Sequence, residues 1–260
     1  MRDVFYEAIK DQSGRVYAEL QNEYQGRYHF HRAFEIAYII DGSTRYMVED
    51  EEYLAQSGDI VFAHRYYRHR SYDTGHMSKY VIAVPENLSH DILKLLEDST
   101  LPSLMTDREF NKSVLPYFEA LVANNGASDI IVKGYASLIF GLLSEHYHST
   151  AILPKSKNVS NIIDILTYVD EHCEEPITLT DIARTFGYNK SYFSRLFNKH
   201  VGSSLSDYIN LVRLNRFELL SENESDRSTT ELVFKSGFQS LATFYRTRDM
   251  RRRGRIGDRG

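Results

Sequence analysis

Apolar residues recur at helical spacing in the C-terminal hundred residues of the chain, and small polar residues mark the turns between them. From Ile177 to Gly202 the apolar positions form two runs, which predict two short amphipathic helices. Gly187 separates the runs, as a residue that adopts positive φ after a helix does. Thr178 or Thr180 offers a hydroxyl cap to the first helix. Two short helices across a glycine turn predict a helix-turn-helix.

The same pattern occurs a second time about fifty positions later. Residues 232–246, LVFKSGFQSLATFYR, repeat residues 182–195, IARTFGYNKSYFSR, with a glycine in the turn and an arginine in the second helix. Between the copies, residues 205–220 predict a helix about 24 Å long at roughly 1.5 Å per residue. Such a helix can hold two helices near the roughly 34 Å repeat of the DNA major groove. The repeat therefore predicts an all-α domain in which a linker helix joins two helix-turn-helices.

Three segments in order resemble the DNA-binding domain of AraC/XylS-type bacterial transcription regulators. They are ITLTDIARTFGYNKSYFSRLFNKHVG, YINLVRLNRFELL and TTELVFKSGFQSLATFYR. The resemblance implies a homodimeric regulator that binds double-stranded DNA and senses a small-molecule effector in a separate N-terminal domain. Activation is the more frequent mode in this family, and an activator also contacts RNA polymerase.

Polar side chains on the second helix of each repeat are the expected DNA contacts. Asn189 or Lys190 opens the first of these two helices. Arg195 and Arg246 suit either a guanine edge or a phosphate. The expected contacts are Asn189, Lys190, Ser191, Ser194 and Arg195 in the first copy, and Gln239, Ser240, Thr243 and Arg246 in the second.

The N-terminal third of the chain has a different pattern. Residues 1–84 contain short β-branched or aromatic runs separated by Asp-Gly and Ser-Gly turns, which predict strands. Asp41-Gly42 lies between two such runs and predicts a hairpin. Several short strands at close spacing indicate an all-β barrel or jelly roll, which senses the ligand in the family that the chain resembles.

The rest of the chain completes a two-domain organisation. Residues 85–150 predict appended helices, which pack on the barrel or form a dimer contact. Residues 151–158 contain Pro and Lys without periodicity and predict a linker. The double helix-turn-helix domain then occupies residues 159–260.

A histidine-rich motif lies within the predicted barrel. His29 and His31, followed by Glu35 and later by His69, resemble the two motifs of the cupin barrel, where these positions hold metal in metal-binding members. Side chains at i and i+2 of a strand face the same way, so both of the first histidines can point inward. Three imidazoles and a carboxylate suit a divalent transition metal such as Zn, Mn or Fe.

Three interpretations of this motif remain open. His64 and Tyr66 stand where the second cupin motif has Pro and Gly, and Glu23 replaces the leading Gly of the first. Sensor cupins of the resembling family commonly bind an organic ligand without metal, so we predict a polar pocket without a cofactor. A bound metal and surface histidines are the alternatives. Tyrosine faces suit a sugar. The expected ligand-binding residues are His29, His31, Glu35, Tyr38, Tyr46 and His69.

Charge and composition are consistent with two different halves. From Lys155 onward there are 17 Lys and Arg against 14 Asp and Glu, whereas the preceding residues have 14 against 22. An acidic half joined to a weakly basic half fits a sensor domain on a DNA-binding domain. The N-terminus has no hydrophobic signal region, and no apolar run is long enough to span a membrane. Cys173 is the single cysteine and is expected to be buried. These features predict a cytoplasmic protein.

The family pattern stops after Thr247. Arg248 stands where the family has an anchoring Phe, and residues 248–260 have no apolar stripe that a packed helix would bury. We therefore expect a less stable second helix-turn-helix. A shifted reading frame or a truncated gene explains the tail better than a basic arm that grips phosphates. The chain is predicted not to be an enzyme. The alternatives are a damaged regulator that no longer binds DNA, and a metal-dependent cupin isomerase or dioxygenase with a DNA-binding tail.

Overall fold

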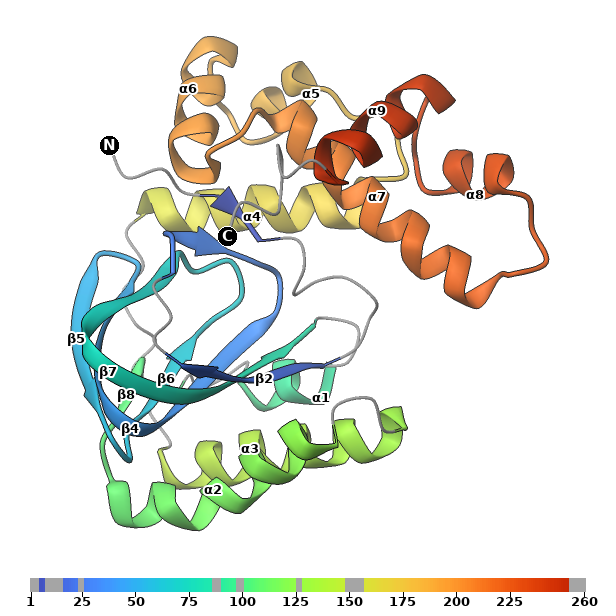
Figure 1. The fold of residues 1–260 in the computed structure, drawn as a ribbon. Helices are drawn as coiled ribbons and strands as arrows, with labels where there is room; N and C mark the ends of the chain where they lie inside the picture. The colour runs from blue at the N-terminus through green and yellow to red at the C-terminus, as the bar shows by residue number, and fades with distance from the viewer. Residues whose placement is uncertain are drawn as a thin grey trace. The chain divides into compact units, whose positions relative to one another are not determined.

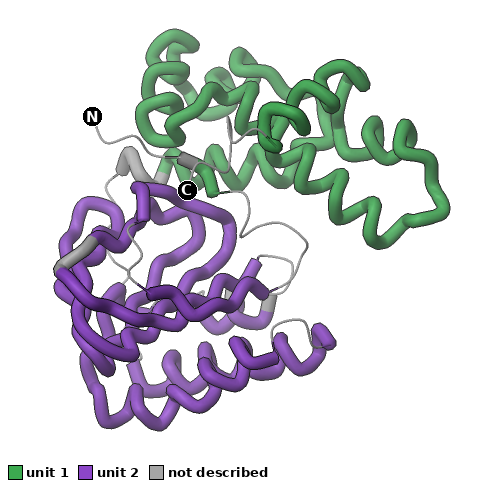
Figure 2. The backbone as a smooth tube through the Cα atoms, in the orientation of Figure 1, with its two compact units in different colours: residues 1–13, 155–260 green, residues 14–154 purple. Residues whose placement is uncertain are grey.

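The computed structural model describes most of the chain and divides it into two compact units. Residues 14–154 form one unit, and residues 155–260 form the other together with residues 1–13 (Figure 2). The short strand β1 (Phe5–Tyr6) is grouped with the helical unit, whereas the predicted barrel starts at residue 1. The described residues are 5–7, 16–22, 26–85, 90–96, 101–124, 128–147 and 157–252.

Residues 14–154 contain an antiparallel sheet centred on two long curved strands (Figure 1). The strand order is β3-β7-β4-β6-β8, and β2 also pairs with β7 while β5 pairs with β4. The predicted all-β domain is therefore confirmed. The strands are β2 (Tyr17–Asn22), β3 (His29–Phe30), β4 (Phe34–Val48), β5 (Glu51–Gln56), β6 (Ile60–Ala63), β7 (His69–Val84) and β8 (Leu104–Met105).

The hairpin predicted at Asp41-Gly42 is wrong, because β4 continues through it as a bulge. The pairing of β4 with β7 shifts register on both sides of this dipeptide. Gly42 has a φ of 76°, and a Cβ there would lie 1.9 Å from the carbonyl oxygen of His76. A bulge and a hairpin both use the positive φ of glycine, so the dipeptide does not distinguish them. The chain turns instead at Glu49, whose φ is 53°.

Alternate residues of β4 face opposite sides of the sheet. Phe34, Ile36 and Tyr38 belong to the apolar core that the sheet shares with α1 (His90–Leu95), α2 (Arg108–Ala123) and α3 (Asp129–His146). The predicted helices of residues 85–150 thus pack on the sheet. Glu35 points to the other face and pairs in register with Ala63 on β6 and Ala83 on β7. These small neighbours leave room on that face for larger side chains.

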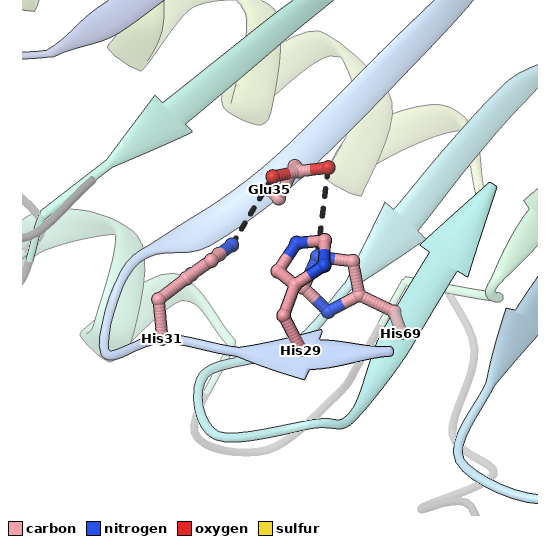
Figure 3. Close-up of side chains that lie close together, drawn as sticks. All are labelled: His29, His31, Glu35 and His69. Atoms are coloured by element: carbon pink, nitrogen blue, oxygen red, sulfur yellow. Dashed lines mark hydrogen bonds and ion pairs between the residues drawn. The ribbon is translucent and has the colours of Figure 1, made fainter. Parts of the chain in front are cut away.

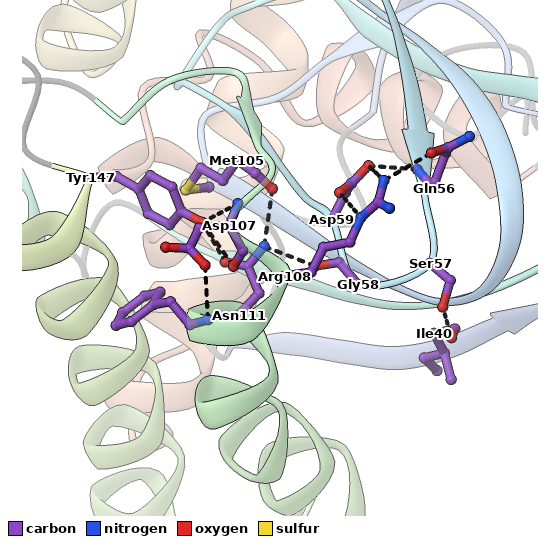
Figure 4. Close-up of polar contacts among 11 residues, drawn as sticks. Ile40, Gln56, Ser57, Gly58, Asp59, Met105, Asp107, Arg108, Asn111 and Tyr147 are labelled. Carbon is purple, nitrogen blue, oxygen red and sulfur yellow. Dashed lines mark hydrogen bonds and ion pairs between the residues drawn. The ribbon is translucent and has the colours of Figure 1, made fainter.

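Polar contacts fasten α2 to the turn before β6 (Figure 4). The buried carboxylate of Asp59 accepts hydrogen bonds from Arg108 Nε at 2.8 Å and from the backbone of Gln56 at 2.8 Å. Asn111 Nδ2 donates to the carbonyl of Gly58 at 2.8 Å, and Tyr147 donates to Asn111 Oδ1 at 2.7 Å. These paired groups join the turn before β6 to α2, and α2 to Tyr147 at the end of α3.

The other unit is helical over residues 157–252, as predicted (Figure 1). Residues 151–156 of the expected linker lie outside the described residues, and the first helix already begins at Lys157. The single cysteine, Cys173, is buried as expected. Among helices of the described residues, none is long and apolar enough to cross a membrane. The helices are α4 (Lys157–His172), α5 (Leu179–Thr185), α6 (Lys190–Val201), α7 (Leu205–Asn223), α8 (Thr229–Lys235) and α9 (Leu241–Arg252).

Hydroxyl and amide side chains set the starts of these helices. Thr178, and not Thr180, caps α5 by accepting from the backbone of Asp181. Ser204 caps α7, and Ser228 forms a capping box with Glu231 at the start of α8. Such caps satisfy backbone N–H groups that have no partner inside the helix. The residues at which these helices begin are therefore determined by the local sequence.

The expectation that no packed helix extends beyond Arg248 is wrong as far as Arg252, where α9 ends. Arg248 is half-buried, and its guanidinium carbon lies 5.3 Å from the ring centre of Phe244 and 4.8 Å from that of Tyr245. Arg251 is buried and bonds to α7. The final helical turn therefore packs through planar guanidinium groups where the resembling family uses an aromatic ring. Residues 253–260 of the predicted tail lie outside the described residues.

Candidate DNA-binding surface and buried histidine cluster

The second helix of the first helix-turn-helix, α6, has one buried face and one polar exposed face. Phe193, Phe197 and Val201 are buried at a spacing of four residues. The remaining face carries expected DNA contacts: Lys190, Ser191 and Arg195 are exposed, and Ser194 is half-buried. The sequence thus places a positively charged, hydroxyl-rich surface on a helix that is anchored from behind.

The second copy, α9, has the same arrangement at its start. Phe244 is fully buried against Phe238 and Phe217, at ring distances of 5.4 Å and 4.6 Å. Arg246 is exposed, as is Tyr245 beside it. Of the expected contacts in this copy, Gln239 and Arg246 are exposed, and Ser240 and Thr243 are half-buried.

Several expected DNA contacts also form hydrogen bonds within the domain. Asn189 is the N-cap of α6, and its side-chain oxygen accepts from the backbone of Ser191 at 3.0 Å. Ser240 Oγ accepts from the backbone of Thr243 at 3.2 Å, and their hydroxyl oxygens lie 3.0 Å apart. Gln239 Nε2 donates to the carbonyl of Gly237 at 3.1 Å. These side chains fix the helix starts, so only part of their bonding capacity is left for DNA.

Tyr192 of α6 lies off the buried face, with 46% of its surface exposed. Its neighbour Phe193 leads the buried stripe, and adjacent helical positions point about 100° apart. Tyr245 on α9 is similarly 42% exposed. The two tyrosines therefore add aromatic groups to the polar surfaces of α6 and α9. The spacing of the buried residues in the sequence is the feature from which this position could have been predicted.

His29, His31, Glu35 and His69 form a buried cluster, none more than 5% exposed (Figure 3). His29 on β3 pairs in register with His69 at the start of β7, and Glu35 lies on β4. One ligand atom from each residue lies within 4.8 Å of those of the others. The motif spacing therefore brings these four residues together, and the alternative of surface histidines is wrong. We call these four residues the histidine cluster.

Backbone carbonyls orient the three imidazoles. The Nδ1 atoms lie 2.7 Å from Arg27 O for His29, 3.0 Å from Ala33 O for His31 and 2.8 Å from Tyr67 O for His69. A carbonyl oxygen can only accept, so each Nδ1 carries the hydrogen and donates it. This arrangement fixes the rings.

The opposite ring nitrogens face the carboxylate of the cluster. His31 Nε2 lies 3.1 Å from Glu35 Oε2, and His69 Nε2 lies 3.5 Å from Glu35 Oε1. Imidazoles held by a carbonyl on one nitrogen and presenting the other inward are typical of metal-binding histidines. The residues present therefore fit a metal that prefers nitrogen and oxygen donors.

The two tyrosines expected in the ligand site lie on different faces of the sheet. Tyr46 is buried opposite Ser71, two residues along β7 from His69, and therefore shares the face of the cluster. The expectation for Tyr38 is wrong. Its ring packs 5.5 Å from that of Phe118 on α2, within the apolar core, where burial raises the pKa of its phenol. The alternation of inward and outward side chains along β4 is the sequence feature that could have distinguished Tyr38 from Tyr46.

A buried lysine next to Tyr46 was not predicted from the sequence. Lys79 Nζ donates to Tyr46 Oη at 2.7 Å and to Ser71 Oγ at 2.7 Å. Lys79 lies at the start of an apolar run within β7, where a lysine ordinarily marks a strand end. Its partners come from β4 and from a distant position on β7, so no local pattern identifies it.

Several known proteins similar to this chain are regulators. An uncharacterized HTH-type transcriptional regulator of Staphylococcus aureus strain MSSA476 is 26% identical over 101 residues, which make up 39% of this chain and only 13% of that protein's length. The HTH-type regulator YbfI of Bacillus subtilis is 23% identical, covering 81% of this chain and 78% of that protein. The solved structure of an apo ToxT variant from Vibrio cholerae is similar with a TM-score of 0.49 and 16% identity, covering 91% and 93% of the two chains.

Two family profiles match successive parts of the chain. The AraC-like ligand binding domain matches residues 14–135, which include the histidine cluster. The helix-turn-helix domain matches residues 182–251, which include α6 and nearly all of α9. Both profiles describe parts of regulators and not of enzymes. The chain therefore belongs to the AraC family of transcription regulators, with an AraC-like ligand-binding domain followed by a helix-turn-helix DNA-binding domain.

Proposed function

We propose that this protein is a one-component regulator that binds promoter DNA through α6 and α9 and responds to a small molecule in its sheet domain. The observation that carries this proposal is the duplicated surface of the helical domain. Arg195 and Arg246 are exposed at matching positions, two residues after the buried rings of Phe193 and Phe244. A duplicated charged surface on two anchored helices suits two successive major grooves.

The geometry of α7 supports binding by both helices. Its 19 residues span about 28 Å at roughly 1.5 Å per residue. The ring of Tyr208, in its first turn, lies 5.9 Å from that of Phe197 on α6, and Phe217 near its other end lies 4.6 Å from Phe244 on α9. Since the two helices pack at opposite ends of a rigid helix, their separation is suited to the roughly 34 Å groove repeat.

The packed end of α9 favours a working regulator over a damaged one. Arg251 of α9 is held by partners on α7, so the second helix-turn-helix retains a last turn although the family's Phe is missing. The protein would act in the cytoplasm, where bacterial promoters lie, and activation is the mode we propose. Contact with RNA polymerase would follow from that mode.

The proposed effector is a small polar molecule such as a sugar, bound near the histidine cluster and Tyr46. Buried imidazoles and a phenol offer hydrogen bonds and an apolar ring face together, which hydroxylated ligands use. The enzyme alternative has less support, because the family to which the chain belongs consists of regulators.

A homodimer is proposed through the outer face of α3. Ile130, Ile131 and Leu138 are exposed there, and Gly134 has open space around its Cβ position. An apolar helix face in contact with water favours burial against a second copy. Light scattering would measure a dimer mass for the wild type and a monomer mass for Leu138→Glu if this face is the interface.

Fluorescence anisotropy on labelled DNA from the gene's own upstream region tests the proposed function. The full-length protein is expected to bind that DNA more tightly than unrelated DNA at a stated salt concentration, and one member of a sugar panel is expected to shift the affinity. Equal binding to all DNA, or none after Arg248→Phe, would refute a regulator role. Specific binding that no sugar alters would leave DNA recognition standing and reject a sugar as the effector.

A further inference from the structure

We propose that Arg213 is a positioning residue for DNA binding, which fixes the recognition helices α6 and α9 relative to each other. This inference rests on the recognition role proposed above for these two helices. Residues 208–215 of α7 are all buried, each at most 9% exposed, so the middle of this helix has no exposed face. Arg213 is the one cation among these eight residues. A buried cation needs polar partners that offset its desolvation.

Two carbonyl groups of the loop between α4 and α5 are such partners. Arg213 Nε donates to Cys173 O at 2.7 Å, and Arg213 Nη2 donates to Glu175 O at 2.8 Å. The carbonyl of Glu175 also accepts from the backbone of Ile177 at 2.9 Å. The next residue, Thr178, caps α5. Arg213 therefore holds the loop from which the first helix-turn-helix starts.

The turn of the second helix-turn-helix meets the same loop. A Cβ on Gly237 would lie 2.3 Å from Cys173 O and 3.0 Å from Arg213 Nε, so the backbone of this glycine packs directly against both. Phe238 follows it, and its ring centre lies 5.4 Å from that of Phe244 on α9. A displacement at Gly237 would thus reach the second recognition helix.

Arg213, Cys173, Glu175 and Gly237 meet at one point, which we call the α7 joint. Hydrogen bonds depend on direction as well as on distance, and the planar guanidinium holds its two acceptors in fixed directions. Apolar contacts have no such directionality, and helices packed through them can slide by small amounts. The α7 joint therefore restricts the rotation of one helix-turn-helix against the other more than apolar packing alone would.

A fixed arrangement of α6 and α9 makes DNA binding depend on the spacing of the two contacted grooves. Once one helix is bound, the other binds at a high effective concentration, but only where the connection between them lets it reach its groove. A rigid joint raises that effective concentration at the matching spacing and lowers it at other spacings. Arg213 therefore contributes to the choice of DNA site through the placement of α6 and α9.

The first test measures the distance between α6 and α9 in the full-length chain without DNA. Nitroxide labels at Lys199→Cys and Asp249→Cys, two exposed positions on these helices, report the distance by pulsed electron paramagnetic resonance. All samples carry Cys173→Ala, because the α7 joint uses the backbone carbonyl of this residue. The chain with Arg213 should give one narrow distribution. Arg213→Met lacks both donors and should broaden it about twofold or more, since packed helices without directional bonds slide.

Arg216→Met is the matched control. Arg216 lies on the same helix, and its Nε donates to Glu174 Oε1 in the same loop at 2.8 Å, but these side chains are 46% and 47% exposed. Exposed ion pairs contribute little, so its distribution should be as narrow as that of the chain without this substitution. If Arg213→Met fails to fold, as judged by circular dichroism, Arg213→Lys takes its place. One ammonium cannot bond two carbonyls as the planar fork does, so this variant should broaden the distribution as well.

The second test asks whether the α7 joint sets the DNA site. Footprinting on DNA from the gene's own upstream region locates the two contacted grooves, and one base pair is then inserted between them. The chain with Arg213 should lose roughly 10-fold or more in affinity, because the gain from linked modules disappears where geometry forbids joint binding. Arg213→Met should bind the original DNA more weakly but lose less than about 3-fold on insertion, since its second helix can adjust. A loss of stability alone would weaken binding to both DNAs and leave the effect of the insertion unchanged.

Three results would overturn the inference. The first is a broad distance distribution in the chain with Arg213. The second is a distribution that stays narrow in folded Arg213→Met and Arg213→Lys, and the third is an insertion that costs all chains the same affinity. The distance measurement needs no DNA, so it separates the two proposals: a distribution that broadens on loss of Arg213, in a chain that binds no DNA specifically, keeps the α7 joint and rejects only the regulator role.

Discussion

Arg251 Nη1 donates a hydrogen bond to Asn215 Oδ1 at 3.1 Å, which joins the last turn of α9 to the middle of α7. Both residues are buried, and Arg251 Nη2 also reaches Glu218 Oε2 at 3.1 Å. Asn215 in turn donates from Nδ2 to the hydroxyl of Tyr6, whose ring packs 5.1 Å from that of Tyr208. A buried polar network therefore holds the second recognition helix where an apolar stripe is missing.

Replacing Arg251 by Ala should destabilise the helical unit by about 1–3 kcal/mol. The substitution leaves the side-chain oxygen of Asn215 buried without this donor, and a buried polar atom that loses its partner costs about that much. Urea unfolding monitored by circular dichroism measures the change. The adjacent Arg252 is exposed, so Arg252→Ala should stay within about 0.5 kcal/mol of the wild type. Equal effects of the two substitutions would show that the network contributes little.

Arg248→Phe should increase the stability of the same unit by about 1 kcal/mol. Arg248 Nε is buried and has no hydrogen-bond partner within the described part of the chain, and the side chain lies on the rings of Phe244 and Tyr245. An aromatic ring would keep those contacts and remove the unpaired donor. Arg248→Lys loses the planar group and should not stabilise. A lower melting temperature for Arg248→Phe would contradict this interpretation.

The two glycines of the helix-turn-helix turns should respond differently to alanine. Both have positive φ, at 71° for Gly187 and 96° for Gly237. Around Gly187 a Cβ meets nothing within 4 Å, whereas at Gly237 it would lie 2.3 Å from the carbonyl oxygen of Cys173 and 3.0 Å from Arg213 Nε. Gly187→Ala should therefore cost about 1 kcal/mol in backbone strain.

Gly237→Ala should cost several times more, about 3 kcal/mol or above, because the turn must also move away from Cys173. Arg213 is buried, donates to that same carbonyl at 2.7 Å and has a pKa lowered by burial. The displacement would thus disturb a buried cation. Thermal unfolding of both variants measures the difference. Similar losses at the two positions would mean that the close contact relaxes without cost.

Local pattern predicted most of the helical domain, because caps, glycine turns and apolar spacing act over only a few residues. Thr178 was identified in this way as one of two cap candidates, and Asn189 as one of two possible starts of the next helix. Arg251 was missed because its partner Asn215 lies 36 residues earlier, and Tyr6 because it pairs with a residue 209 positions away. Contacts at such separations carry no local signature.

The histidine cluster was predictable for a similar reason, since His29, His31 and Glu35 lie within seven residues, on β3, the turn after it and the start of β4. The bulge at Asp41-Gly42 was not predictable, because the tight contact of Gly42 with the His76 carbonyl depends on how β7 returns beside β4. Lys79 is comparable, since its partner Tyr46 comes from the neighbouring strand.

Acid should destabilise the second helix-turn-helix through Glu231. Hydrogen bonds from the Ser228 hydroxyl and backbone lower the pKa of this carboxyl below its usual 4.5. A carboxyl with a lowered pKa in the folded state stabilises it above the unfolded value and loses that contribution as the pH falls through the folded one. Stability should therefore decrease below about pH 4.5. Melting temperatures from pH 6 to pH 3 should fall less steeply in Glu231→Gln, whereas Glu222→Gln, on the exposed face of α7, should follow the wild type.

Arg195→Ala and Arg246→Ala should each weaken DNA binding, because both guanidinium groups lie exposed on the proposed recognition surface. A base contact would cost about 1–3 kcal/mol at the cognate site and leave binding to unrelated DNA unchanged. A phosphate contact would instead weaken binding to all DNA and reduce the slope of log affinity against log salt by about 1. Anisotropy at several salt concentrations on both DNAs distinguishes these outcomes.

The control for this pair is Arg45→Ala, an equal change of charge on the sheet domain, where Arg45 pairs with Glu52. Its affinity should match the wild type on both DNAs, since a surface charge outside the recognition helices contributes little once salt screens it. If Arg195→Ala and Arg246→Ala bind every DNA as Arg45→Ala does, α6 and α9 are not the recognition helices. A loss in Arg195→Ala alone would mean that only the first helix-turn-helix engages DNA, because both arginines are exposed at matching positions.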